Sequence, residues 1–197
     1  MITIAVTGHR PSRLGGHWDP RLYLPVIERL ARHLEEKAKA EPITLISGMA
    51  LGWDMIAAAA AVIAKDRGAP ITLICAVPFE GQHKRWTDAT SVAWYWRLRE
   101  RADKVVVVSK GGYDRTLMLK RNEWMVEQAD MVLACWDGSD GGTGHCVHYA
   151  QMHGRKVVNV YANYFPEAWT WTARWNQTTK DEATAPLHPT QAVHAGP

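Results

Sequence analysis

A glycine-rich loop separates a short apolar run from a helical pattern in residues 131–150, MVLACWDGSDGGTGHCVHYA. Glycines let the backbone approach a ligand closely, so successive N–H groups can point into one concavity. The first turn of a following helix adds unpaired donors at the positive end of its dipole. We expect the turn formers from Asp137 to Gly144 to lie outside that helix. This chemistry suits an anion such as phosphate, and a plain surface turn is the structural alternative.

Length and composition indicate one globular domain. The chain has 197 residues, of which 47% are hydrophobic and 22% are charged. It has neither the roughly eighteen-residue apolar stretch of a membrane span nor the pattern of a signal peptide, so we expect a cytoplasmic protein with no membrane partner. Three cysteines without CxxC spacing indicate a reducing compartment, and neither disulfides nor a metal site is expected.

The charge balance and the aromatic content each bear on possible partners. A net charge of +3 with a sequence pI near 8.8 is too mild to indicate nucleic-acid binding. Ten tryptophans are unusual for this length. They could fill a core or an interface, or they could offer faces on which a base stacks. Packing is the favoured interpretation, because it is the commonest role of aromatic side chains.

Apolar runs alternate with helical patterns as far as residue 161. We expect strands over residues 2–6, 43–46, 71–77, 104–109, 131–136 and 156–161, and helices over 25–40, 53–65, 88–102 and 115–128. Continuous Val/Ile/Leu strands favour a mainly parallel sheet buried on both faces. With right-handed crossovers, this predicts a three-layer, Rossmann-like α/β domain over residues 1–165. Residues 166–197 are expected to form a short helix over 166–175 and then a tail.

In such a sheet the carboxyl ends of the strands share one edge, and ligands bind there at the switch in strand order. We expect strand 131–136 to lie beside strand 2–6, so that three loops surround one pocket. This edge offers the anion donors, polar groups and apolar wall that a nucleotide needs. Neither GxGxxG after the first strand nor GxxxxGK[ST] occurs, which argues against a dinucleotide fingerprint and a P-loop. The candidate ligand-binding residues are Thr7, Gly8, His9, Arg10, Ser47, Gly48, Met49, Ala50, Gly52, Asp54, Pro78, Phe79, Asp137, Gly141, Gly142, Thr143, Gly144 and His145.

Three of these candidates have structural alternatives. Arg10 could clamp a phosphate or form a surface ion pair, and the clamp is favoured. His9 could bond a ribose hydroxyl or satisfy the loop backbone, and the backbone role is favoured. Asp54 could contact the ligand or only interact with a helix dipole, which is worth about 0.3 to 1 kcal/mol.

The ordered set TGHRP, SGMALGWD, PF, KRNEWMVEQAD and GGTG resembles the SLOG superfamily, and its YpsA-like branch most of all. SGMALGWD is similar to the SG-x-A-x-G-x-D signature of the DprA/Smf DNA-processing proteins, and GGTG resembles a reduced PGGxGTxxE motif of the LOG phosphoribohydrolases. The resemblance covers residues 2–161. It implies a Rossmann-like domain that binds a nucleotide or nucleotide-derived ligand such as NAD or ADP-ribose. It also adds Asn122, in an Arg-Asn pair, to the candidate ligand contacts.

Departures from the LOG motif bear on catalysis. Aligning the glycines puts His145 where that family has threonine and His148 where it has its catalytic glutamate. Cleaving an N-glycosidic bond builds positive charge on the ribose, and a histidine does not simply replace a carboxylate there. We therefore expect a sensor or binding protein, with a nucleotide-processing hydrolase that uses another carboxylate, such as Asp54, as the alternative.

A DprA-like, DNA-associated protein is a second alternative. The mild net charge argues against it, because binding to nucleic acid depends strongly on basic side chains that neutralise phosphates. We expect a homo-oligomer, in which a partner subunit holds the tail.

Overall fold

The computed structural model describes residues 1–16 and 18–165. In this part of the chain, six strands form one sheet in the order β4-β3-β2-β1-β5-β6, and every neighbouring pair is parallel. The strands are β1 (Ile2–Gly8), β2 (Ile43–Ser47), β3 (Ile71–Val77), β4 (Lys104–Val107), β5 (Met131–Cys135) and β6 (Lys156–Asn159). The predicted three-layer, Rossmann-like α/β fold is confirmed.

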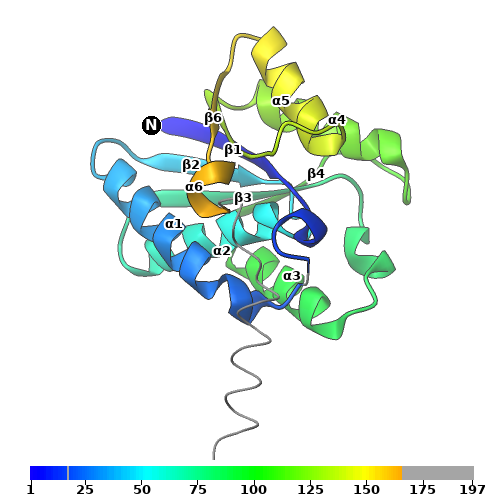
Figure 1. Cartoon of the computed structure of the whole chain (residues 1–197), viewed down its shortest axis with the longest axis horizontal. Coiled ribbons are helices and arrows are strands. Elements are labelled where there is room, and N and C mark those ends of the chain that lie inside the picture. Colours follow the sequence, from blue (N-terminus) through cyan, green and yellow to red (C-terminus); the bar gives the residue numbers. More distant parts are fainter. Residues whose placement is uncertain (17, 166–197) are drawn as a thin grey trace, which may run out of the picture.

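Helices cover both faces of the sheet (Figure 1). They are α1 (Leu24–Ala38), α2 (Trp53–Asp66), α3 (Ala89–Arg101), α4 (Arg115–Glu127), α5 (Gly142–Met152) and the short α6 (Tyr161–Tyr164). Figure 1 shows α1, α2 and α3 on one face and α4 and α5 on the other. Short 3-10 helices lie at Pro11–Arg13, Pro20–Tyr23 and Gln82–Arg85.

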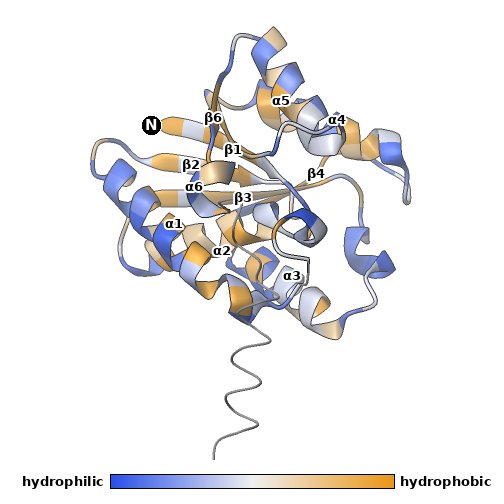
Figure 2. Ribbon diagram, in the orientation of Figure 1, coloured by the Kyte–Doolittle hydropathy of each residue, from blue (hydrophilic) through white to orange (hydrophobic). Residues whose placement is uncertain are grey.

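Each face of the sheet has its own buried core. The α1/α2 side holds the larger one, in which the alanines of α2 let its backbone pack close to β1, β2 and β3. The smaller core joins β5 to α4 and α5 through Val132, Met125 and Val147. Figure 2 shows apolar strands between the helices and a polar outer face on α1, which is the pattern of an amphipathic surface helix.

The edge strands differ from the sequence prediction. The run of valines after Lys104 forms β4 at one edge of the sheet, and β6 lies at the other edge. Both end residues of each of these strands are exposed, so burial on both faces is wrong for the edges. Apolar residues occur here too, because Val105 of β4 and Val157 of β6 pack against the two cores.

Helix α5 also begins earlier than the sequence predicts. Gly141 occupies the N-cap position without a side-chain cap, and Gly142, Thr143 and Gly144 form the first turn, so the expectation that Gly142 and Gly144 lie outside the helix is wrong. Glycine has low helix propensity, but most helical stability in proteins comes from packing. Cys146, Val147 and Ala150 supply that packing against the sheet.

The expected helix over residues 166–175 and the tail to residue 197 lie outside the described residues, and the division at residue 165 stays a prediction. No described helix combines the length and the apolar character needed to cross a bilayer.

Candidate functional site

A cavity of about 500 Å³ opens at the carboxyl edge of the sheet, beside the ends of β1 and β5. The pairing of these two strands confirms the predicted topology. Because β1 has β2 on its other side, the cavity lies where the strand order switches. Its volume is in the range of small-molecule sites. The lining residues are Thr7, Gly8, His9, Arg10, Ser12, Arg13, Ala50, Asp54, Tyr113, Arg115, Met118, Leu119, Arg121, Asn122, Asp140, Gly141, Gly142 and Thr143.

Basic side chains dominate the charge of this cavity. Arg10 and Arg13 follow β1, and Arg115 and Arg121 belong to α4, so guanidinium groups approach from two elements far apart in sequence. Asp54 and Asp140 only partly offset them. Arginine presents several donors in a planar fork that matches the oxygens of phosphate or carboxylate. The cavity therefore suits an anion.

A buried pair of opposite charges forms the cavity's inner wall. Arg121 Nη1 lies 3.8 Å from Asp54 Oδ2, and the two side chains are only 5% and 6% exposed. Arg121 also donates to the carbonyls of Gly48 and Ala76. Burial raises the pKa of the Asp54 carboxyl, while Arg121 and Arg10 oppose that rise. Burial also lowers the pKa of Arg121, yet arginine stays charged because its pKa starts so far above neutrality.

The loop between β2 and α2 is folded to hold this pair. Ser47 Oγ donates to the Asp54 carbonyl at 2.7 Å and accepts from the Met49 N–H at 3.2 Å. Met49 adopts a left-handed φ of 56°, and a buried Gln82 amide donates to its carbonyl at 2.8 Å. A side chain at Gly48 would collide with the Arg121 guanidinium. The glycine in SGMALGWD therefore makes room for the arginine that neutralises Asp54.

At the rim, a histidine and an arginine converge on one carboxylate. His9 Nε2 lies 2.7 Å from Asp137 Oδ1 and 3.0 Å from the Asp137 backbone nitrogen. A protonated Nε2 donates to the carboxylate, and a deprotonated one accepts from the N–H. Burial lowers the pKa of His9, although contact with Asp137 opposes the shift. Arg13 Nη1 lies 2.9 Å from Asp137 Oδ2, which ties the loops after β1 and β5 together.

The pKa of Asp137 is held well below its usual range. Its partial burial favours the neutral acid, but the hydroxyl and backbone N–H of Ser139 outweigh that effect, together with Arg13 and His9. Asp137 therefore stays charged and holds the loops after β1 and β5 together.

The start of α5 supplies backbone donors to the cavity. The first N–H groups of a helix have no intrahelical acceptor, and Gly141 has no side chain with which to cap them. Gly141 has a φ of 142°, which side chains rarely allow, whereas a Cβ at Gly142 would meet no atom within 4 Å. The Asn122 amide donates to the Gly142 carbonyl at 3.1 Å and so fixes the turn from α4. Together with the dipole, these donors suit an anion.

The structure divides the sequence candidates into two groups. The cavity is lined by Thr7, Gly8, His9, Arg10, Ala50, Asp54, Asn122, Gly141, Gly142 and Thr143. The candidates outside the lining are Ser47, Gly48, Met49, Gly52, Pro78, Phe79, Asp137, Gly144 and His145. Ligand binding by either group stays a prediction.

The second group supports the cavity from behind or beside it. A side chain at Gly52 would strike the His9 carbonyl. Phe79 is 2% exposed and packs its ring edge-to-face on Tyr113, which does line the cavity. His145 instead lies beside Glu123, with 3.4 Å between Nε2 and Oε1.

Apart from Asn122, the sequence candidates missed the contribution of α4. Arg115, Met118, Leu119 and Asn122 follow the i, i+3, i+4, i+7 spacing of one helical face, and all line the cavity. The same spacing is visible in the sequence, and the polar residues at its two ends, Arg115 and Asn122, were the signal that this helix face lines a site. Within the described residues, no group of three or more His, Cys, Asp or Glu side chains is placed to hold a metal ion.

Comparison with known families places these features in context. The YpsA family model, described as the YspA SLOG family, matches residues 4–164. The uncharacterized SPbeta prophage-derived protein YoqJ of Bacillus subtilis is 33% identical over 139 residues, which cover 65% of this chain and 77% of YoqJ. The UPF0398 protein ABC2016 of Shouchella clausii is 30% identical over 147 residues, covering 72% of this chain and 76% of that protein.

Three solved structures share the fold. The TM1055 structure superposes with a TM-score of 0.52 at 19% identity, covering 90% of this chain and 81% of that one. DNA processing protein A (DprA) from Streptococcus pneumoniae superposes with a TM-score of 0.55 at 15% identity, covering 95% of this chain and 62% of that one. DNA processing protein A from Helicobacter pylori, described for its single-stranded DNA binding mode, superposes with a TM-score of 0.53 at 15% identity. The match covers 91% of this chain and 81% of that one. At such identities the likeness extends to the fold alone.

Proposed function

The chain belongs to the YspA SLOG family, and from this premise we propose that it binds a nucleotide or nucleotide-derived ligand of the NAD or ADP-ribose type. The ligand's phosphates would lie in the cavity at the carboxyl edge of the sheet, and the protein would act as a sensor or binding protein. A cytoplasmic location and a homo-oligomeric state remain part of this proposal.

One observation carries the proposal. Guanidinium groups from the β1 loop and from α4 approach the same cavity as the uncapped N-terminus of α5. Phosphate oxygens satisfy all of these donors, and a low-dielectric wall strengthens each contact. The buried Asp54 carboxylate pairs with Arg121, whereas Arg10 and Arg115 form no ion pair within the described residues.

Hydrolysis at an N-glycosidic bond is the second candidate, and Asp54 is the observation in its favour. Its carboxylate reaches the cavity, and burial raises its pKa. However, Arg121 holds it at 3.8 Å. His148, which aligns with the LOG glutamate, is exposed on α5 and packs its ring against Trp136. Binding without rapid hydrolysis is therefore favoured.

A DNA-associated role is the third candidate. Its support is the shared fold with the two DprA structures, at 15% identity. The net charge of +3 weighs against strong binding to a polyanion at physiological salt.

Calorimetric titration of the full chain with AMP, ADP, ADP-ribose and NAD tests the proposal. We expect at least one of them to bind, and Arg10→Ala to weaken that binding by about 1.5 to 3 kcal/mol, or roughly ten- to more than a hundredfold. Arg32→Ala is the matched control, because Arg32 is exposed on α1 and contacts only the neighbouring Glu28 among the described residues. The proposal fails if none of the four binds, or if both variants bind like the parent.

A further inference from the structure

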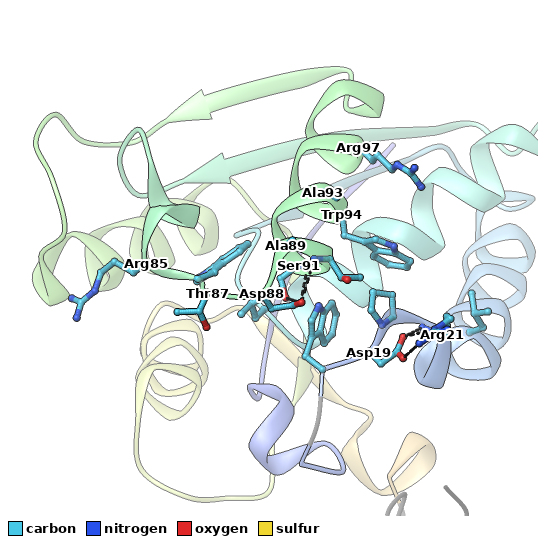
Figure 3. A pocket seen from close by; sticks show the side chains of 16 residues that line it. Asp19, Arg21, Arg85, Thr87, Asp88, Ala89, Ser91, Ala93, Trp94 and Arg97 are labelled. Carbon is cyan, nitrogen blue, oxygen red and sulfur yellow. Dashed lines mark hydrogen bonds and ion pairs between the residues drawn. The ribbon is translucent and has the colours of Figure 1, made fainter. Parts of the chain in front are cut away.

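A second and larger cavity adjoins the candidate site. It measures about 1160 Å³ and lies between the 3-10 helix Pro20–Tyr23 and the start of α3. Trp18, Trp86 and Trp94 contribute to its walls, and all three are partly exposed. Figure 3 shows Trp94 projecting from α3 into the middle of the cavity. None of the sequence motifs considered above includes these tryptophans.

The tryptophan rings are held from one side. Trp18 packs on Tyr23 with ring centroids 5.2 Å apart and meets Trp94 edge-to-face at 6.4 Å. Trp86 packs edge-to-face on the buried Tyr95 at 5.4 Å. Rings anchored in this way lose little freedom when a planar group stacks on their remaining surface. The indole N–H of Trp18 is buried without a hydrogen-bond acceptor among the described residues.

The charges around this cavity favour an electron-rich or anionic guest. On α3, Arg99 and Arg101 pair with Glu80 and Asp66, whereas Arg97 has no ion-pair partner within the described residues. Arg97 lines the cavity, and Figure 3 shows its side chain extending along one side of it.

The acidic groups of the lining are already engaged. Asp19 holds Arg21, with 2.6 Å between Oδ2 and Nη2. Asp88 caps α3 by accepting from the backbone of Thr90 and Ser91. The cavity therefore presents aromatic faces and the Arg97 guanidinium, which has no ion-pair partner in the part of the chain that the structure describes. These are the groups that bind a nucleobase by stacking and cation–π contacts.

The linings of the two cavities are neighbours at two points. Ala50 lines the first cavity and its neighbour Leu51 lines the second. Arg85, from the second, lies over the ring of Tyr113, from the first, with 3.9 Å between the guanidinium carbon and the ring centroid. An elongated ligand that occupied both cavities would pass these residues.

We propose that the tryptophan-walled cavity is the nucleobase subsite of a ligand whose phosphates lie in the arginine-lined cavity. This inference rests on the proposed function and narrows it to a ligand that carries both a diphosphate and an aromatic base, as ADP-ribose and NAD do. The polar first cavity selects the phosphates, and the second selects the planar ring.

Calorimetry with pyrophosphate and ADP-ribose separates the two subsites. Trp94→Leu should weaken ADP-ribose about five- to 150-fold, the range for losing one base–aromatic stack, and leave pyrophosphate affinity unchanged. Trp96→Leu is the matched control, because Trp96 lies on the same helix, is 40% exposed and does not line the cavity. Arg10→Ala should weaken both ligands.

Each outcome has one meaning. If Trp94→Leu weakens both ligands equally or neither, the base subsite is wrong while phosphate binding stands. If the parent binds neither ligand, the proposed function fails as well. If Trp94→Leu weakens binding of a single-stranded oligothymidylate but not of ADP-ribose, the inference is overturned, and the tryptophan cavity is a binding site for DNA. If Trp94→Leu does not fold, indole N–H signals of the parent decide, because ADP-ribose should shift those of Trp18 and Trp94 and pyrophosphate should not.

Discussion

The buried Arg121–Asp54 pair gives the most demanding prediction about the site. Replacing Arg121 by methionine keeps much of the side-chain volume but leaves Asp54 facing no partner charge on α4. Breaking a buried pair by removing one member costs about 3 to 5 kcal/mol. For a chain of this size, that corresponds to a fall in Tm of roughly 6 to 20 °C. The carbonyls of Gly48 and Ala76 also lose their donor, which acts in the same direction.

The pH dependence identifies the cause. Burial already raises the pKa of Asp54 above its ordinary value of 3.8, so the folded protein binds this proton more tightly than the unfolded chain. The contribution of Asp54 to the free energy of unfolding is therefore greatest below pH 3.8, and it falls as the pH rises from 3.8 through the folded pKa. Removing Arg121 raises that pKa further, so the Tm deficit of Arg121→Met should grow as the pH rises through the folded pKa of Asp54 in the parent.

Thermal unfolding monitored by circular dichroism measures both effects. Arg101→Met is the control, because Arg101 and Asp66 form an exposed pair whose loss should cost less than about 1 kcal/mol. The double variant Arg121→Met/Asp54→Asn should recover part of the loss, because no unpaired carboxylate remains. A Tm deficit for Arg121→Met that matches the control, or that does not change with pH, would refute the buried-pair reasoning.

Three further predictions concern the rim, the glycine turn and the chemistry. Because burial lowers the pKa of His9, its contribution to stability is lost as the pH falls below its unfolded value of 6.5, so His9→Gln should flatten the decline of Tm between about pH 7 and pH 5. The exposed His148→Gln variant should decline as steeply as the parent. Gly142→Val should keep the parent's circular dichroism but block phosphate binding, since its side chain would enter the open space above α5, whereas Gly112→Val should bind normally in the same titration. With AMP, chromatography should show slow or no release of adenine, and rapid release would make Asp54→Asn the first variant to assay.

The sequence carried most of the fold because its signals are local. Apolar runs and helical stripes located the strands and helices to within a few residues, and the parallel pattern placed their carboxyl ends at one edge. The errors come from tertiary packing. Helix α5 begins at Gly142 because its later residues pack on the sheet, and the valines of β4 lie at an edge because the chain crosses back after β4 and places β5 beside β1.

The candidate site was predicted in part for the same reason. Loop residues that directly follow β1, β2 and β5 could be found from their positions in the sequence. The burial of Arg121 could not, because it depends on Asp54 from a helix much earlier in the chain. Likewise, Arg13 and Asp137 are separated by 124 residues and meet only in the folded protein. The tryptophan cavity has no local signature, since its walls come from a loop and a distant helix.

A crystal structure of the full chain with ADP-ribose tests the central claim most directly. The account predicts diphosphate oxygens within hydrogen-bond distance, roughly 2.7 to 3.2 Å, of the backbone nitrogens at Gly142 and Thr143 and of the Arg10 guanidinium. Saturating ADP-ribose that leaves this cavity empty, or that binds at the opposite edge of the sheet, would contradict it.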